Sequence, residues 1–183
     1  MAQTTAANGK LTARVTHLDM PAPPAHRVPV PTGPKLAVLR ATNMPIAFYR
    51  YLYEQVGRAH HWLLRRNLSD EELAGFIHGE QAEIQVLYVD GSPAGFFELD
   101  LSNLPAEAEI LYFGITPDFQ GRGLAKFFLS EAVFAAWAHR PVRVVIHTNT
   151  LDSPRALQLY QRIGFSPYAS SQEEVEPWVD TRR

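Results

Sequence analysis

Residues 110–129, I-L-Y-F-G-I-T-P-D-F-Q-G-R-G-L-A-K-F-F-L, predict a strand, a tight turn and a helix. The first six residues are apolar, aromatic or glycine, and Thr116-Pro117 bounds them, which is typical of a strand that runs into a turn. Residues 124–137 carry apolar side chains at helical spacing among good helix formers. Gln120-Gly121-Arg122-Gly123 joins the two elements. The stretch therefore predicts a buried strand that leads into a helix through a glycine-rich turn.

This turn has the chemistry of an anion-binding site. A helix N-terminus exposes backbone N–H groups and carries partial positive charge from the helix dipole. Glycine lets the backbone approach a ligand closely, and Arg122 adds a positive charge nearby. The pattern is not the G-x-G-x-x-G dinucleotide fingerprint, and no Gly-Lys-Ser/Thr follows as it would in a P-loop. We therefore expect a pyrophosphate-sized ligand held by a different motif.

The turn resembles the acyl-CoA signature Q/R-x-x-G-x-G/A of the GNAT superfamily of N-acyltransferases, with Gln120, Gly123 and Ala125 at the three defined positions. The resemblance covers roughly residues 36–168. It implies that acetyl-CoA is the cosubstrate and that successive backbone N–H groups bind its pyrophosphate. The residues expected to do so are Gln120, Gly121, Arg122, Gly123, Leu124 and Ala125.

The same resemblance implies a place for the pantetheine arm. In this family the arm lies like an added strand beside the strand before the turn, which corresponds to Phe113 and Ile115. A splay in that strand exposes an N–H to the thioester carbonyl. We expect the splay at Gly114, because glycine eases a bulge.

A second signature lies further along the chain. Residues 156–165, A-L-Q-L-Y-Q-R-I-G-F, resemble the family pattern A-x-x-x-Y-x-k-x-G-F, in which the tyrosine protonates the leaving thiolate. That position is Tyr160, and a phenol of pKa about 10 suits a thiolate of pKa about 8–9. The alternative is that Tyr160 simply packs in the core. The family often has Asn three residues before the alanine, where this chain has Ser153, and Asn149 could take over the contact to pantetheine.

Glu109 is the predicted general base. In the protein-lysine acetyltransferase branch, a glutamate six residues before the final aliphatic residue of this strand has that role, and Glu109 lies six before Ile115. Strand alternation would place Glu109, Leu111, Phe113 and Ile115 on one face. The alternative is a solvated strand-end carboxylate. Rival bases are Glu107, Glu98, Asp100 and His147.

Several residues are candidates for the acceptor site. His147 ends a strand near where acceptors bind in this fold, although a lone histidine there is more often structural. Aromatic residues of the first helix and the following segment could form a pocket, a core or a dimer surface, and Glu98 could hold a cationic substrate. These are Tyr49, Tyr53, Trp62, Glu98 and His147. His60 and His61 are adjacent, which is poor spacing for a metal, so we expect none.

The order of elements predicts an α/β (α+β sandwich) fold: a GNAT-like mixed, mostly antiparallel sheet flanked by helices on both faces. Strands at residues 82–89, 94–99 and 107–115 form a meander that leads into the glycine turn, with Asp90-Gly91 as a hairpin signal. Residues 35–183 would form the acyltransferase domain. Residues 1–34 would be a proline-rich N-terminal arm with a possible edge strand at residues 11–18, or a disordered leader.

Composition excludes several classes of protein. The 183 residues are 46% hydrophobic with net charge −2, so one core-forming domain is expected and no basic field favours nucleic acid or membrane. The chain has no cysteine, which excludes a cysteine-acyl intermediate. No apolar run approaches the ~20 residues of a membrane span, and the N-terminus lacks a signal-peptide core. We expect a cytoplasmic monomer or homodimer.

The sequence therefore favours an N-acetyltransferase that moves acetyl from acetyl-CoA to a primary amine, more consistent with a small molecule than a protein. Two alternatives remain open at this stage. One is a non-catalytic acyl-CoA-binding sensor or partner module, and the other is a protein lysine or N-terminal acetyltransferase.

Overall fold

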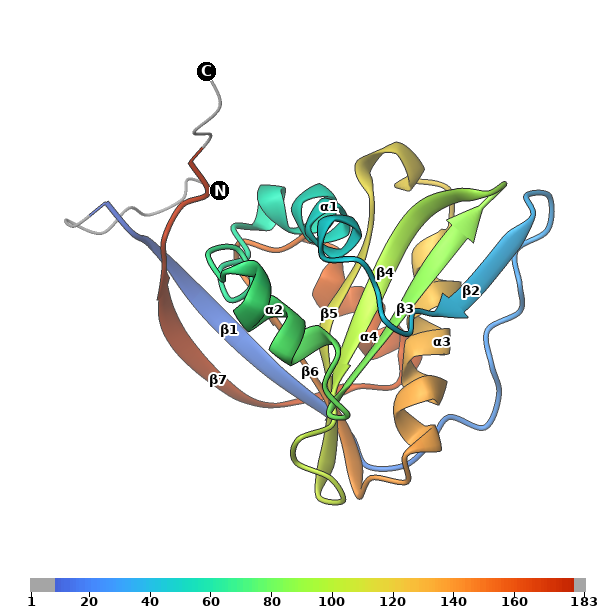
Figure 1. The fold of residues 1–183 in the computed structure, drawn as a ribbon. Coiled ribbons are helices and arrows are strands. Elements are labelled where there is room, and N and C mark those ends of the chain that lie inside the picture. Colours follow the sequence, from blue (N-terminus) through green and yellow to red (C-terminus); the bar gives the residue numbers. More distant parts are fainter. Residues whose placement is uncertain (1–8, 180–183) are drawn as a thin grey trace.

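Seven strands form one sheet in the order β2-β3-β4-β5-β6-β1-β7 in the computed structural model, which describes residues 9–179 (Figure 1). Neighbouring strands are antiparallel except for β5 and β6, which run parallel. A parallel pair needs a long crossover, and α3 provides it. The strands are β1 (Leu11–Met20), β2 (Leu36–Arg40), β3 (Ala82–Val89), β4 (Ser92–Asp100), β5 (Glu107–Ile115), β6 (Arg143–Asn149) and β7 (Ser166–Val175).

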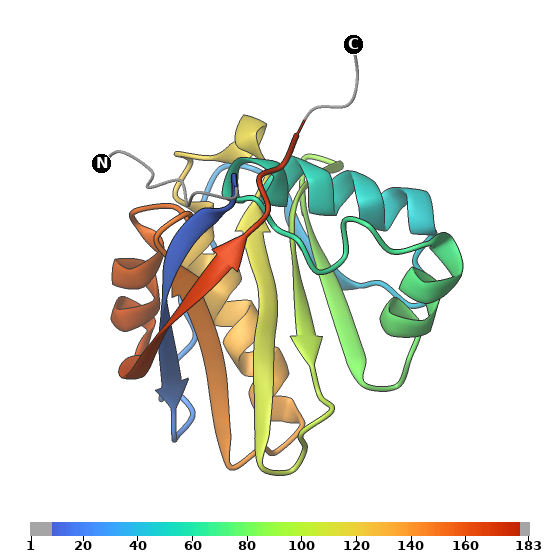
Figure 2. The same cartoon turned by 90° about the vertical axis from the view of Figure 1, so that its left-hand side faces the viewer.

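Helices cover both faces of the sheet, which confirms the predicted fold class (Figures 1 and 2). One hydrophobic core lies between the sheet and α1 with α2, and a second lies between the opposite face and α3 with α4. Ser69 caps α2 in a capping box with Glu72, as its Ser-x-x-Glu spacing dictates. The helices are α1 (Ile46–Gly57), α2 (Asp70–Ile77), α3 (Leu124–Ala138) and α4 (Ala156–Ile163), and the 3-10 turns are η1 (Arg58–His60) and η2 (Pro117–Phe119).

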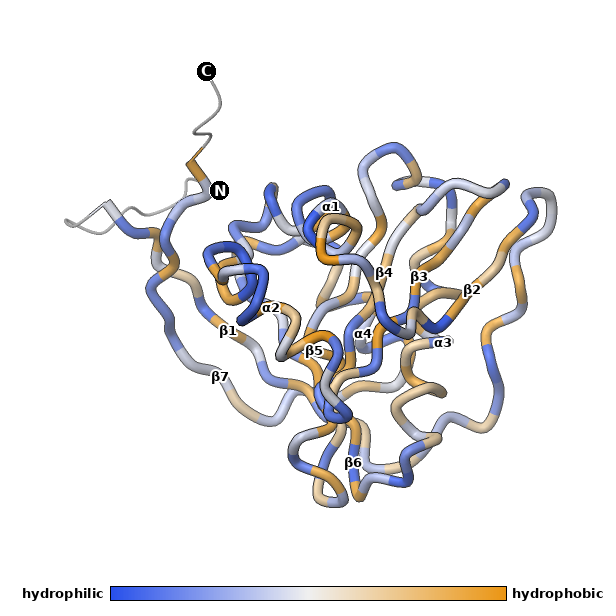
Figure 3. Tube along the Cα trace, viewed as in Figure 1, coloured by the Kyte–Doolittle hydropathy of each residue, from blue (hydrophilic) through white to orange (hydrophobic). Residues whose placement is uncertain are grey.

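β1 is an interior strand, so the prediction of an edge strand here was wrong. It pairs antiparallel with β6 on one side and with β7 on the other. The alternating sequence indicated a strand, but alternation carries no information about which strands lie next to it. The edge at this end of the sheet is β7, whose residues are exposed except for Val175 and mostly hydrophilic (Figure 3).

The proline-rich segment that follows β1 runs along α3 towards β2 (Figure 1). Arg27 forms an ion pair with Glu131 of α3 at 2.9 Å and lies over the ring of Phe134. The Val28 N–H donates to the Ser130 hydroxyl at 3.0 Å. This segment is therefore attached to the domain surface. Residues 1–8 of the predicted arm lie outside the described part of the chain.

A bulge in β5 decides which side chains face the site. Leu99 pairs with Ile110 while its neighbour Glu98 pairs with Tyr112, so Leu111 is the extra residue. Before the bulge, Ile110 belongs to the core under α3, whereas Tyr112 belongs to the core under α1. The bulge therefore reverses the alternation of β5 at Leu111.

Candidate active site

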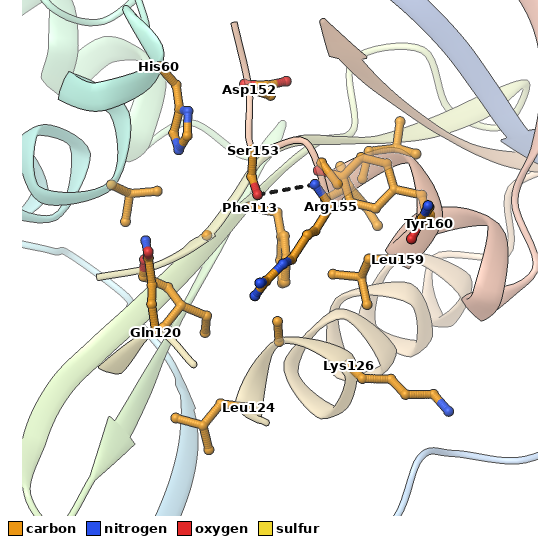
Figure 4. Close-up of a pocket in the computed structure, with 18 of the residues that line it drawn as sticks. His60, Phe113, Gln120, Leu124, Lys126, Asp152, Ser153, Arg155, Leu159 and Tyr160 are labelled. Atoms are coloured by element: carbon orange, nitrogen blue, oxygen red, sulfur yellow. Dashed lines mark hydrogen bonds between the residues drawn. The ribbon is translucent and has the colours of Figure 1, made fainter. Parts of the chain in front are cut away.

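A cavity of about 620 Å³ lies where β5 and β6 part (Figure 4). The backbone register between the two strands ends at Ile110 and Ile146. Beyond that rung, the edge of β5 that faces β6 has no strand partner among the described residues, so it could pair with an extended ligand. The cavity is lined by residues of both strands, the glycine turn, the start of α3 and α4, and also by Val56, His60 and Trp62.

The glycine turn has the conformation that close ligand approach requires. Gly121 and Gly123 both have φ of +75°, a left-handed conformation that side chains disfavour, and open space lies where a Cβ would stand. Gly123 is the residue before α3, so the N–H groups of the first helical turn follow directly. The Gln120 side chain donates to the carbonyl of Ile115 at 3.0 Å and so fixes the turn to the end of β5.

Arg122 does not line the cavity, although the sequence placed its charge there. Its guanidinium donates to the Asp118 carbonyl at 2.7 Å and lies over the Phe119 ring. The basic side chains that do line the cavity are Lys126, Arg155 and Arg162. Figure 4 shows Arg155 reaching from the start of α4 into the space between Gln120 and Leu159.

Sequence reasoning missed these three cations. The spacing of Arg155 and Arg162 was a usable signal, because residues seven apart share one face of a helix. Their charges, together with the glycine turn, suit a ligand that carries several phosphates.

The splay of β5 that we expected at Gly114 from the sequence lies elsewhere in the strand. The bulge lies at Leu111, and a Cβ on Gly114 would stand 2.1 Å from Val56 Cγ1. Gly114 is therefore a close-packing position that lets the end of α1 approach β5. Phe113, Gly114 and Ile115 nevertheless line the cavity.

Tyr160 lines the cavity from α4 and is only 7% exposed. Its hydroxyl has no hydrogen bond to any described residue. Burial, with a smaller contribution from Asp152, raises the pKa of this hydroxyl well above its ordinary value. A protonated phenol that faces the cavity can donate to a bound ligand.

Asn149 does not reach the cavity. Its side chain donates to Glu173 at 2.9 Å and accepts from the Leu151 N–H at 2.8 Å, which fixes the loop after β6. Ser153 lines the cavity instead (Figure 4). A polar contact to pantetheine from this loop would therefore come from the serine that stands where the family often has asparagine.

Glu109 does not share a face with Phe113 and Ile115, as strand alternation predicted, because the bulge at Leu111 intervenes. Glu109 lies outside the cavity lining, whereas His147 is part of it. The two are nevertheless partners: His147 Nε2 is 3.0 Å from Glu109 Oε1. This carboxylate raises the pKa of His147, Glu173 and Asp152 act in the same direction, and burial opposes them.

The remaining acceptor-site candidates separate into two groups. Trp62 lines the cavity, and its ring centroid lies 4.8 Å from that of Tyr112. Tyr49, Tyr53 and Glu98 belong to the α1 side of the sheet and do not line this cavity. Glu98 is 1% exposed; it accepts from the Tyr49 hydroxyl at 2.5 Å and pairs with Arg65 at 2.9 Å. Burial raises the pKa of Glu98 against the opposing effect of Arg65.

Comparisons with known proteins agree with this geometry. The chain is 31% identical over 123 residues to an uncharacterized N-acetyltransferase of Methanocaldococcus jannaschii, covering 64% of this chain and 46% of that protein. It therefore spans about half the length of this curated relative.

Solved structures share the fold at identities that support the fold alone. A tandem GNAT protein from the clavulanic acid biosynthesis pathway has a TM-score of 0.63 at 17% identity, over 88% of this chain and 53% of that chain. A spermidine N-acetyltransferase from Vibrio cholerae has a TM-score of 0.60 at 20% identity, over 73% of this chain and 81% of that chain.

The family model of the acetyltransferase (GNAT) family matches residues 38–165. The match includes β5, the glycine turn, α3 and Tyr160, which are the parts that line most of the cavity. The chain belongs to the GNAT family of acetyltransferases.

Proposed function

We propose that this protein transfers the acetyl group of acetyl-CoA to a primary amine of a small molecule by direct attack. The observation that carries the proposal is the cavity between the parted strands, with the glycine turn on one side and the Tyr160 hydroxyl on another. The turn and the three cavity cations would hold the phosphates, and the free edge of β5 would hold pantetheine. No helix of the described chain has the length and apolarity to cross a membrane.

The chemistry would be one displacement. The amine nitrogen forms a bond to the thioester carbon, the carbon–sulfur bond breaks, and the Tyr160 hydroxyl gives its proton to the departing sulfur. The amine must lose one proton to a base at the opposite side of the carbonyl. The chain has no cysteine, so the acetyl group does not pass through a cysteine thioester.

A small acceptor is favoured by the apolar side chains of Val56 and Trp62 in the cavity lining. One structural neighbour is a spermidine N-acetyltransferase, which indicates that this fold accommodates a small amine. A cytoplasmic location and a monomeric or homodimeric state, as the sequence predicts, form part of the same proposal.

The test is thiol release from acetyl-CoA with ethanolamine, butylamine, benzylamine, 1,4-diaminobutane and free lysine, beside a lysine-containing peptide and a peptide with a free N-terminus. We expect release with at least one small amine. Faster release with either peptide would make the protein a protein acetyltransferase. Thermal protection by CoA without thiol release would make it a non-catalytic acyl-CoA-binding module.

A further inference from the structure

His147 occupies the point at which β6 leaves β5. The last backbone rung joins Ile110 to Ile146, so His147 is the first residue of β6 beyond the paired region. It lines the cavity beside Leu111 and Phe113 of the parted strand. The His147 imidazole therefore lies where β5 and β6 separate. An acyl group bound along β5 would meet its acceptor amine there.

Glu109 stands behind this imidazole. Its carboxylate is 3.0 Å from His147 Nε2 and its side chain is 19% exposed. Nε2 is the ring nitrogen near Glu109, and no hydrogen bond joins Nδ1 to a described residue. When the neutral ring carries its proton on Nε2, the nitrogen near Glu109, the lone pair is on Nδ1.

The N-terminal strand, β1, also contacts His147. His17 of β1 is the direct backbone neighbour of His147, and the two ring centroids are 5.2 Å apart. His17 is itself held by Ser171 of β7, with 2.9 Å between Nε2 and Oγ. Since the family match begins at residue 38, β1 lies outside the matched region.

We propose that His147 is the base that takes the proton from the acceptor amine, that Glu109 orients it, and that His17 of β1 positions its ring. This assignment rests on the proposed function. As the nitrogen–carbon bond forms, one N–H proton of the amine passes to Nδ1 of His147, while Tyr160 protonates the sulfur. Glu109 acts through His147 and is a positioning residue, because it does not line the cavity.

The pH dependence follows from the charges around His147. Glu109 on β5 raises its pKa, and Glu173 on β7 and Asp152 after β6 act in the same direction. His17 is a further titratable group beside it, and His60 lines the same cavity. The imidazolium cannot accept a proton, so activity should be low in acid and rise as the pH passes through the raised pKa of His147.

Two conservative variants distinguish His147 from Glu109 as the base, using thiol release with acetyl-CoA and the amine panel. His147→Gln should lower kcat/KM by about 100-fold or more and remove the acidic limb, with CoA binding intact. Glu109→Gln should keep the limb and move it to lower pH, because the anion that favours the imidazolium is gone while burial remains. If Glu109→Gln removes the limb and His147→Gln keeps it, Glu109 is the base and the proposal is overturned.

His139 provides a matched control. It pairs with Glu83 at 2.9 Å, so it is also a histidine beside a buried carboxylate, but it does not line the cavity. His139→Gln should leave the rate and the acidic limb unchanged. A loss equal to that of His147→Gln would mean that any broken His–Glu pair impairs the enzyme, which overturns a specific role for His147.

Histidine NMR tests whether Glu109 and His147 interact, and it needs no enzyme turnover. His147, assigned from the resonance missing in His147→Gln, should titrate above the ordinary histidine value and at lower pH in Glu109→Gln. An unchanged titration overturns the pair. Absence of thiol release by the unsubstituted protein with every acceptor overturns the proposed function, and with it His147 as base, whereas the NMR result still reports on the pair.

His17 is tested by retaining or removing its ring. His17→Ala should lower kcat and shift the His147 resonance, whereas His17→Phe keeps the ring contact and should recover most of the rate. The melting temperature of each variant separates loss of positioning from loss of fold. A His17→Ala variant with unchanged kcat and an unchanged His147 titration would exclude β1 from the site.

Discussion

Replacing Gly123 with valine should abolish CoA binding at a predictable cost to the fold. The residue has φ of +75°, and nothing lies within 4 Å of the position where a Cβ would stand. A side chain therefore fits, but the left-handed backbone costs about 1–2 kcal/mol. At about 2–4 °C per kcal/mol for a chain of this size, the melting temperature of the free protein should fall by roughly 2–8 °C.

The stabilisation by bound CoA is a separate effect, and it is larger than the cost of the left-handed backbone. At a CoA concentration about 100 times Kd, binding stabilises the unsubstituted protein by about 2.7 kcal/mol, or roughly 5–11 °C in melting temperature. Valine at Gly123 adds bulk beside the N–H groups at the start of α3 and strains the turn that aims them. We expect this CoA-dependent rise to disappear, as measured by differential scanning calorimetry with and without CoA.

Gly91→Val is the matched control. Gly91 lies in the β3–β4 hairpin with φ of +86°, also has open space at its Cβ position, and does not line the cavity. This variant should lose similar stability and keep the full rise with CoA. If Gly123→Val keeps the rise as well, the glycine turn does not bind the pyrophosphate and the reasoning from its conformation is refuted.

Three further predictions test other parts of the molecule. Tyr160→Phe should lower kcat by about 10- to 1,000-fold with CoA affinity intact, and an unchanged kcat in steady-state assays would make Tyr160 a packing residue beside Phe165. Deleting residues 1–20 removes β1 from between β6 and β7 and should prevent folding; a monodisperse product with native circular dichroism would contradict this. Gly114→Val should destabilise the protein by about 1–3 kcal/mol in urea unfolding, because its Cβ meets Val56; an unchanged midpoint would mean that α1 moves away freely.

Local signals were sufficient for much of the site. One cavity is lined by Tyr160, Phe113, Gly114, Ile115 and the residues of the glycine turn other than Arg122. Their positions depend on short-range features, namely a strand, a left-handed turn and a helix start, which are encoded within a few residues. The assignments of function to these residues remain predictions that the variants above test.

The features that the sequence did not predict depend on contacts between residues that are far apart in the chain. Which face Glu109 occupies depends on a bulge at Leu111, and the bulge exists only in the pairing of β5 with β4. Tyr49, which the sequence offered for an acceptor pocket, a core or a dimer surface, packs in the core under α1, and Glu98 is buried beside it. Residue type and local spacing do not distinguish a side chain that lines a pocket from one that packs in a core.

The sequence by itself indicated the element order, a glycine-rich turn before a helix and the acetyltransferase family to which the chain belongs, because these reside in local patterns. Only the tertiary structure placed β1 between β6 and β7 and brought His17 to His147, residues 130 positions apart in the chain. Strand order follows from the burial of both faces of the sheet, a property of the whole chain that no local pattern specifies. For that reason motifs could propose which residues bind acetyl-CoA, whereas the contact between Glu109 and His147 required the fold.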